Sequence, residues 1–197
     1  MRRIGIFGGT FNPPHNGHVS AAKAFFEKMK LDELIIIPAF MPPHKDLDTS
    51  VTCDNRFAMC RLAFKDIPNT RVSDLEMSRG GRSYTYLTLQ ALTNTDCELY
   101  FLCGTDMILT LDSWKNPDVI FSLASICYIR READDLTTEL IEKKCREYSE
   151  IFNARVFAID ADVIEISSSE IRGNLSDMTR YLSDDVVDYI RKEGLYE

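Results

Sequence analysis

The sequence predicts an α/β fold of the doubly wound, Rossmann-like type, with helices on both faces of a parallel sheet and a small C-terminal helical part. Two observations support this prediction. Short runs of apolar and β-branched residues recur along the chain, and they are continuously apolar rather than alternating, as in strands buried on both faces. Segments with helical spacing separate these runs, which is the order typical of a parallel sheet.

The expected elements can be placed in order along the chain. The runs expected to form strands are residues 4–7, 34–37, 71–72, 99–103, 126–129 and 156–159. The segments expected to form helices are residues 19–29, 56–64, 85–92, 137–148 and 184–192. Gly194 follows the last of these, where a glycine commonly ends a helix. Because the carboxyl ends of parallel strands meet at one edge, the loops that follow the strands are expected to build the functional site.

Length and composition indicate the class of protein. The 197 residues have the length of one domain, and we interpret residues 1–197 as a single unit. A hydrophobic content of 45% and a charged content of 27% are typical of globular proteins. The net charge of −8 disfavours nucleic acid as a partner, because surfaces that bind nucleic acid are normally basic. A local cluster of cations can nevertheless bind a small polyphosphate.

The sequence also bears on location. No apolar run approaches the length of a signal peptide or a transmembrane helix, so we expect no membrane partner. The six cysteines form no C-x-x-C pair, and several fall inside expected strands or helices. We therefore expect reduced thiols and a cytoplasmic protein.

A glycine turn and a loop with two histidines follow the first strand. Gly8 and Gly9, next to Thr10, let the backbone approach a phosphate closely, and a helix start presents unpaired N–H groups to an anion. His15 and His18 stand where the next helix is expected to begin, so they can donate hydrogen bonds to phosphate oxygens in a transition state. A glycine pair alone is common in tight turns. The pair of histidines is what favours phosphoryl chemistry on a nucleotide.

A zinc site is the competing interpretation of the histidines, because imidazole is a common metal ligand. Such a site would need His44 or a nearby cysteine, and no further ligand stands at a spacing typical of zinc sites. We therefore expect that the chain itself binds no metal here.

Other loops at the same edge carry candidate residues. Lys45 lies in the proline-stiffened segment 38–48, where it either binds a triphosphate or is a solvated surface lysine. Gly104 and Asp106 follow the strand 99–103, and Asp106 is expected to cap the next helix or to bind a ribose hydroxyl. Trp114, the only tryptophan, either packs in the core or stacks on a base.

Two segments precede helices and carry hydroxyl groups. Ser83 and Thr85 are candidate helix caps, and with Tyr84 they can equally line a pocket for a small planar acid. In the late segment 166–172, serines at a helix start are also typical caps. Ser168 and Arg172, however, are four residues apart and therefore share a helix face, which favours a phosphate cradle that also includes Ser169. The last strand of such a sheet need not lie at its edge, so this cradle is expected to face the first loop.

These segments resemble the motifs of a known family. The T/H-x-G-H nucleotidyltransferases carry an HxGH motif after the first strand and an ISSxxIR-like motif late in the chain, and residues 15–18 and 166–172 fit both. Within that group the chain resembles the bacterial nicotinate-nucleotide adenylyltransferases over nearly its full length. The matching segments are GGTFNPPHNGH, PPHK, SYTYLTL, FLCGTDM with the downstream tryptophan, ISSSEIR and YLSDDVVDYIRKEGLY.

The resemblance implies an activity and a role for each matching residue. The implied reaction joins ATP and nicotinate mononucleotide to give deamido-NAD and pyrophosphate, with Mg²⁺ carried by ATP. The implied catalytic residues are His18, His15 and Arg172. The implied ATP-binding residues are Gly8, Gly9, Thr10, His15, His18, Lys45, Gly104, Asp106, Ser168, Ser169 and Arg172. The implied nicotinate-nucleotide-binding residues are Ser83, Tyr84, Thr85 and Trp114.

The chain departs from the family pattern in places that concern the substrate pocket and subunit contacts. Leu87 stands where the family often has aspartate, and residues 130–132 replace a usual R-P-G. The sequence leaves open whether the chain forms a homo-oligomer. The alternative functions are an adenylyltransferase for nicotinamide mononucleotide or phosphopantetheine, and a nucleotide-binding sensor without catalytic activity.

Overall fold

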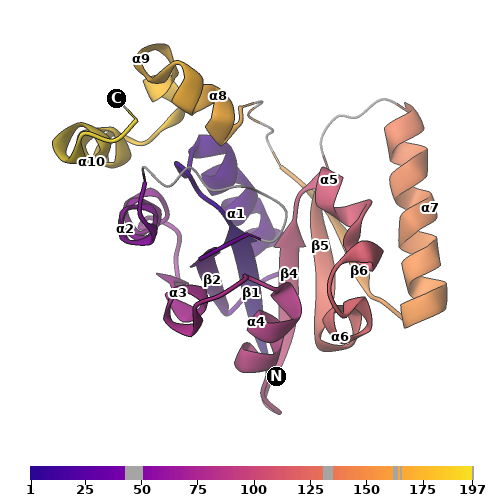
Figure 1. The fold of residues 1–197 in the computed structure, drawn as a ribbon. Coiled ribbons are helices and arrows are strands. Elements are labelled where there is room, and N and C mark those ends of the chain that lie inside the picture. The colour runs from indigo at the N-terminus through magenta and orange to yellow at the C-terminus, as the bar shows by residue number, and fades with distance from the viewer. Residues whose placement is uncertain (43–50, 131–134, 162–163, 165, 197) are drawn as a thin grey trace.

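A parallel sheet forms the centre of the molecule (Figure 1). The computed structural model describes residues 1–42, 51–130, 135–161, 164 and 166–196. Among these residues the strands are β1 (Arg2–Gly9), β2 (Glu33–Pro38), β3 (Thr70–Val72), β4 (Cys97–Cys103), β5 (Ala124–Arg130) and β6 (Val156–Asp160). They pair in the order β3-β2-β1-β4-β5-β6, all parallel. The predicted doubly wound α/β class is confirmed, and the strand order reverses between β1 and β4.

Helices connect the strands and cover both faces of the sheet (Figure 1). Those within the strand succession are α1 (Asn16–Lys28), α2 (Cys53–Ala63), α3 (Leu75–Arg79), α4 (Thr85–Leu92), α5 (Thr105–Ile108), α6 (Pro117–Leu123) and α7 (Asp135–Phe152). Those after β6 are α8 (Ser168–Gly173), α9 (Leu175–Met178) and α10 (Asp184–Glu193), with single 3-10 turns at Leu111–Ser113 and Thr179–Tyr181. All five helices predicted from spacing are present. The helical spacing does not predict α3, α5, α6 and α9, because such short segments carry little periodic pattern.

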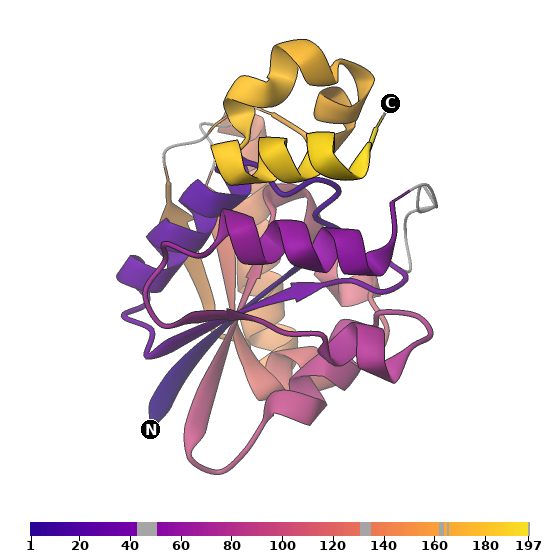
Figure 2. The ribbon, with the colours of Figure 1, turned by 90° about the vertical axis from the view of Figure 1, so that its left-hand side faces the viewer.

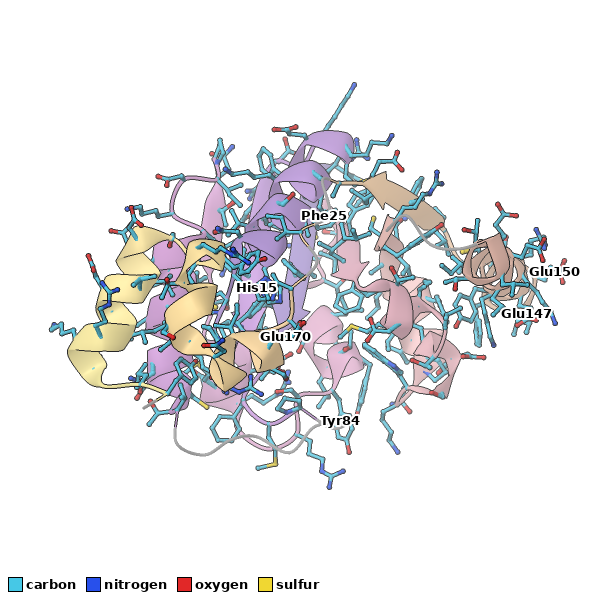
Figure 3. All side chains as sticks on the ribbon, turned by 90° about the horizontal axis from the view of Figure 1, so that it is seen from above. His15, Phe25, Tyr84, Glu147, Glu150 and Glu170 are labelled. Carbon is cyan, nitrogen blue, oxygen red and sulfur yellow. The ribbon has the colours of Figure 1, made fainter. Side chains whose placement is uncertain are left out.

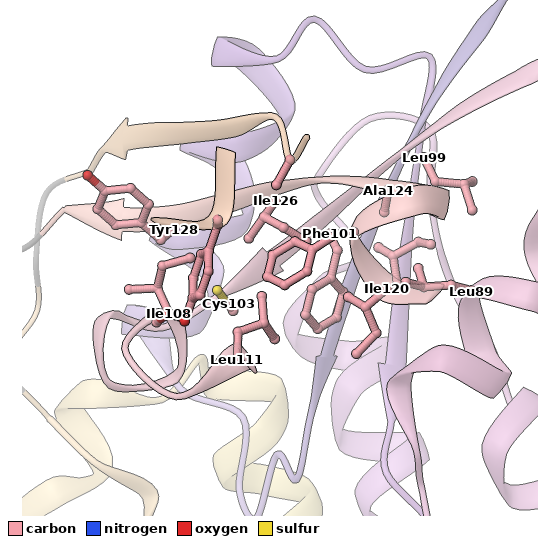
Figure 4. Packing of buried hydrophobic residues seen from close by; sticks show 14 of the residues in the cluster. Leu89, Leu99, Phe101, Cys103, Ile108, Leu111, Ile120, Ala124, Ile126 and Tyr128 are labelled. Carbon is pink, nitrogen blue, oxygen red and sulfur yellow. Dashed lines mark hydrogen bonds between the residues drawn. The ribbon is translucent and has the colours of Figure 1, made fainter. Parts of the chain in front are cut away.

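Two layers of buried side chains explain why the strand sequences are continuously apolar. Along β4, Phe101 contributes to the layer beneath α4, α6 and α7, where it joins Leu89 and Ile120 (Figure 4). The alternate residue Leu102 contributes to the layer beneath α1 and α2, with Phe25. Because successive residues point to opposite faces and both faces are covered, the run Leu99–Cys103 of β4 is apolar throughout.

The C-terminal helices lie above the carboxyl end of the sheet (Figure 1) and pack on α2 (Figure 2). Met59 of α2, Ile171 of α8 and Ile190 of α10 belong to one buried cluster. α10 ends at Gly194 in the left-handed region with φ 60°, so the predicted glycine cap is confirmed. This packing holds α8 at the edge where the strands end.

The connection after β6 brings α8 to the first strand. β6 lies at the edge of the sheet, beside β5. The chain then returns across the carboxyl end of the sheet, and Ser168 Oγ donates a hydrogen bond of 2.8 Å to the carbonyl of Pro13. The late serine-arginine segment therefore reaches the first loop because its connection crosses the sheet, and not through an interior position of the last strand.

Candidate active site

The loop after β1 places two imidazoles close together at the start of α1, with their ring planes tilted by 30°. His15 is the N-cap residue of α1, and His18 lies in the first turn. The main-chain N–H of His15 donates to Nδ1 of His18 over 3.2 Å, and the two ring centroids are 3.7 Å apart. Because Nδ1 accepts, the neutral His18 ring carries its proton on Nε2, the tautomer that can donate to a phosphate oxygen.

Gly17 allows this arrangement. A Cβ at Gly17 would lie 3.1 Å from Nδ1 of His15 and 3.2 Å from the carbonyl oxygen of Ile164. Both contacts are tighter than ordinary van der Waals separations, so a larger residue would displace the His15 ring or the chain that crosses over it. Steric contacts therefore require glycine at position 17, between the two histidines.

Side chains of α8 donate hydrogen bonds to the loop after β1. The guanidinium of Arg172 donates through Nη1 to the carbonyl of Asn12 over 2.6 Å and through Nη2 to Ser169 Oγ over 3.1 Å. Ser168 is bound to Pro13, as described above. Ser167 caps α8, since its Oγ accepts from the N–H of Glu170. One serine therefore satisfies the helix start, and Ser168, Ser169 and Arg172 are available to the loop and to a ligand.

These segments line one cavity of about 570 Å³ at the carboxyl end of β1 and β4. Figure 3 looks onto this end and shows His15 beside the helix of Glu170, with Tyr84 on another wall. The sequence-predicted residues that line the cavity are Gly8, Gly9, Thr10, His15, His18, Ser83, Tyr84, Thr85, Gly104, Asp106, Trp114, Ser168, Ser169 and Arg172. The remaining one, Lys45, lies outside the described residues, as does His44. The structure thus brings every described candidate to one site, while their individual roles stay predictions.

The loop after β4 forms a second wall. Gly104 is the N-cap residue of α5, and Thr105 Oγ1 ties the loop to the carbonyl of Ile129 over 2.8 Å. Asp106 makes no capping hydrogen bond, so the capping alternative for this residue is wrong, and its side chain is exposed at the cavity rim. Trp114 is half-buried and meets Phe101 edge-on at 6.3 Å between ring centroids. Trp114 therefore both packs against the core and lines the cavity.

The wall before α4 is tied to the loop after β2. Ser83 Oγ accepts from the N–H groups of Phe40 and Met41, at 2.9 and 3.3 Å. Tyr84, not Ser83 or Thr85, is the N-cap residue of α4, and it makes no side-chain cap. The prediction that Ser83 or Thr85 caps α4 is therefore wrong. The Ser83 hydroxyl instead satisfies the backbone of the neighbouring loop.

A buried polar network behind this wall was not predicted from the sequence. Thr88 donates to Glu76 over 2.6 Å, and Arg79 lies 3.3 Å from the same hydroxyl and 3.9 Å from the Glu76 carboxylate. Glu76 and Thr88 are buried, and both line the cavity. The network joins α3 to α4 across the glycine loop 80–81. No motif marks Glu76, whose role depends on a contact twelve residues away.

Asn12 is a second residue that sequence reasoning missed. It is 3% exposed; its carbonyl accepts from Arg172, and its Oδ1 accepts from the hydroxyl of Tyr196 over 2.6 Å. Both donors come from the C-terminal helical part, more than 150 residues away in sequence. A pairing over such a separation leaves no local signal.

The surroundings of Glu170 and Cys103 shift the pKa values of these two groups in opposite directions. Hydrogen bonds from the side chain and backbone of Ser167 lower the pKa of Glu170, and the nearby His15 acts in the same direction. Cys103 also lines the cavity, but burial raises its pKa far above the ordinary thiol range. Cys103 therefore stays protonated and is not a thiolate nucleophile.

The zinc alternative finds no support in the described part of the chain. Across residues 1–42, 51–130, 135–161, 164 and 166–196, no group of three or more histidine, cysteine or acidic side chains is arranged to hold a metal ion. The six cysteines are free. Within the same ranges, no helix combines the length and the apolar character that a membrane crossing requires.

Comparison with known families agrees with this geometry. The family model described as cytidylyltransferase-like matches residues 6–174, which extend from β1 to the end of α8 and include both histidines and Arg172. The chain belongs to the cytidylyltransferase-like family. The match spans most of the chain and includes both the first loop and α8, which line the cavity from two sides.

Relatives place the chain among the nicotinate-nucleotide adenylyltransferases of that family. A protein of Lachnoclostridium phytofermentans named "Probable nicotinate-nucleotide adenylyltransferase" is 35% identical over 201 residues, covering 100% of both chains. A protein of Clostridium acetobutylicum with the same name is 35% identical over 202 residues, again covering 100% of both. The resemblance found in the motifs is therefore confirmed over the full length.

Solved structures share the fold of this cytidylyltransferase-like chain. The nicotinic acid mononucleotide adenylyltransferase of Plasmodium falciparum, complexed with NaAD, superposes with a TM-score of 0.78 at 23% identity, covering 100% of this chain and 98% of that one. The same enzyme complexed with APC gives a TM-score of 0.76. At this identity the likeness supports the fold.

Proposed function

We propose that this protein transfers the adenylyl group of ATP to nicotinate mononucleotide, giving deamido-NAD and pyrophosphate in NAD biosynthesis. One observation carries the proposal: the neighbouring imidazoles of the first loop and the Ser168–Arg172 face of α8 line the same cavity. An anion held there would meet donors from both sides. The names of the full-length relatives support this choice of substrates.

The chemistry is an in-line displacement at the α-phosphorus of ATP. An oxygen of the mononucleotide phosphate forms the new P–O bond, and the bond to the bridging oxygen of pyrophosphate breaks. The nucleophile is already an anion, so the reaction needs no general base. Catalysis then depends on positioning and on neutralising the crowded negative charge of the transition state. We assign that neutralisation to His18, His15 and Arg172.

The remaining residues bind the substrates. We propose that Gly8, Gly9 and Thr10 hold phosphate oxygens, that Ser168 and Ser169 hold the terminal phosphates, and that Gly104 and Asp106 meet the ribose. Ser83, Tyr84, Thr85 and Trp114 would enclose the nicotinate ring, with hydroxyl and N–H donors that suit a carboxylate. We propose that Mg²⁺ arrives bound to the triphosphate, where it neutralises phosphate charge.

Measurement of pyrophosphate release tests the proposal. The purified protein is incubated with ATP, Mg²⁺ and nicotinate mononucleotide, and in parallel with nicotinamide mononucleotide or phosphopantetheine. We expect the highest kcat/KM with nicotinate mononucleotide. A protein that binds a non-hydrolysable ATP analogue and releases no pyrophosphate with any acceptor would be a sensor, and the proposed function would be wrong.

A further inference from the structure

Arg56 is a fully buried cation whose charge the reaction outlined above does not use. It lies on α2 and is 1% exposed. Its Nη1 donates to the carbonyl of Thr10 over 2.8 Å, and its Nη2 lies 3.5 Å from the carbonyl of Phe40 and 3.1 Å from the sulfur of Cys53. Its Nε atom has no hydrogen-bond partner in the described part of the chain.

The described residues supply no anion for this guanidinium. None of the ion pairs that they form includes Arg56, and its partners are two neutral carbonyl groups and a thiol. Removing a charge from water without a counter-charge costs several kcal/mol. Burial of Arg56 in this way therefore lowers the stability of the fold, and packing alone does not explain its position.

Its position relative to the cavity provides that reason. Thr10 directly follows β1, and Phe40 lies two residues after the end of β2, so Arg56 ties together the loops that leave two neighbouring strands. Thr10 lines the cavity with Gly9 and Phe11 on either side of it. The guanidinium thus lies directly behind the stretch of backbone against which we place the triphosphate.

We infer that Arg56 is an electrostatic positioning residue for the polyphosphate: it holds the two loops, and its buried charge is balanced by the bound triphosphate. The inference rests on the proposed function of this cavity. A charge in a poorly screened interior attracts every negative charge of a nearby ligand. The contribution of Arg56 to binding should therefore grow with the number of phosphates on the ligand.

Two substitutions separate the charge from the hydrogen bonds. Arg56→Met and Arg56→Lys both remove the planar fork, and only Arg56→Lys keeps the charge. Dissociation constants are measured by calorimetry, without Mg²⁺, for adenosine, AMP, ADP and ATP. For Arg56→Met we expect ATP binding to weaken by about 10-fold or more, with progressively smaller losses for ADP and AMP and no loss for adenosine. For Arg56→Lys we expect the same small change across the series.

Arg61→Met is the matched control, because Arg61 lies on the same helix and is exposed. It should leave the whole series unchanged, since solvent screens its charge. A loss of equal size for adenosine and ATP in Arg56→Met would overturn the inference and leave Arg56 a loop-shaping residue. If Arg56→Met does not fold, Arg56→Lys decides: a loss that grows with ligand charge there would overturn the inference, because the charge is kept. A wild-type protein that binds no ATP would instead overturn the proposed function.

Discussion

At the scale of single residues, the site contains side chains that face the cavity and others that hold them. His18 is of the first kind, because its ring lines the cavity while its Nδ1 accepts from the backbone of His15. Thr88 is of the second kind, because it fixes the Glu76 carboxylate behind the wall of the cavity. Substitution of a residue of the first kind should impair turnover, whereas substitution of a residue of the second kind should reduce stability.

Replacement of His18 by alanine should impair the chemical step. We expect turnover with ATP and nicotinate mononucleotide to fall about 10²–10³-fold, as when a single oxyanion donor is removed, while the protein still unfolds cooperatively with at most the loss of one helix-cap contact. Steady-state kinetics and thermal unfolding measure the two effects. Lys23→Ala, on the exposed side of the same helix, is the control and should retain full activity. A His18→Ala enzyme with normal turnover would exclude His18 from catalysis.

Replacement of Thr88 by valine should destabilise the protein and weaken mononucleotide binding. The change leaves the buried Glu76 carboxylate without the hydroxyl that donates to it, which costs about 1–3 kcal/mol of unfolding free energy. Urea unfolding measures this loss, and Thr95→Val at an exposed position is the control. Because the network lies behind Ser83 to Thr85, we expect KM for nicotinate mononucleotide to rise more than KM for ATP. An equal rise in both KM values would contradict this assignment.

At this scale the sequence predicts the residues that lie near each other along the chain. His15 and His18 share one loop, and Ser168 and Arg172 share one turn of helix, so spacing alone suffices to select them. Asn12 is different, because its partner Tyr196 is 184 residues away. Glu76 and Arg56 are charged residues that no local pattern marks as buried. Their roles arise from tertiary contacts, which one sequence does not display.

At the scale of secondary structure, the strand-to-helix junctions determine where donors and acceptors lie. α8 shows this clearly: Ser167 and Glu170 satisfy the start of the helix reciprocally, so Ser168 and Arg172 can bind the loop after β1. The apolar runs predict the strands because both faces of the sheet are covered. The helical spacing does not predict α3, α5, α6 or α9, which are shorter than two full helical periods.

The hydrogen bonds that cap α8 should make the stability of the protein depend on pH. Hydrogen bonds from Ser167 lower the pKa of Glu170, so this interaction stabilises the protein above the ordinary carboxyl range and is lost as the pH falls through the lowered pKa. In Ser167→Ala we expect the Glu170 pKa to rise toward its ordinary value, as followed by NMR titration of the carboxyl group. The substitution should also cost about 0.5–2 kcal/mol, typical of a lost N-cap. An unchanged Glu170 pKa would show that Ser167 is not its cause.

The packing of α1 on β1 leaves no room at Gly5. A Cβ there would lie 2.8 Å from Cε1 of Phe25 and would also overlap Leu31. Gly5→Ala should therefore destabilise the protein by about 1–3 kcal/mol, the usual cost of overpacking, as measured by urea unfolding. Gly173→Ala is the matched control, because no atom lies within 4 Å of its added Cβ. Similar stability of the two variants would contradict this view of the core.

At the scale of the whole molecule, parts of the chain that lie far apart in sequence line one cavity. The N-terminal loop, the loop after β4 and the C-terminal α8 all contribute to its lining. A ligand that bridges them should stabilise the folded protein as a unit. The sequence predicts this convergence because parallel strands have their carboxyl ends on the same side of the sheet. It does not predict the connection that returns to the first loop from β6, the outermost strand.

Binding of an ATP analogue should therefore raise the unfolding free energy. At a free ligand concentration of one hundred times Kd we expect about 2.7 kcal/mol, seen as a single shifted transition. Arg172→Ala should reduce this stabilisation, because the guanidinium contacts the first loop from the C-terminal part. Differential scanning fluorimetry with and without the analogue measures both effects. Two separate transitions, of which only one responds to the analogue, would show that the site does not span the molecule.

The crossing from β6 back to the first loop has a consequence for biosynthesis. A nascent chain emerging from the ribosome can pair β1 with β2 early, yet the loop that carries His15 and His18 meets Ser168 and Tyr196 only after those two residues have been translated. Until then the growing polypeptide lacks the part of the cavity lining that α8 contributes. Catalytic competence should therefore appear abruptly, once α8 and Tyr196 have left the ribosome and can fold onto the first loop, rather than in proportion to chain length.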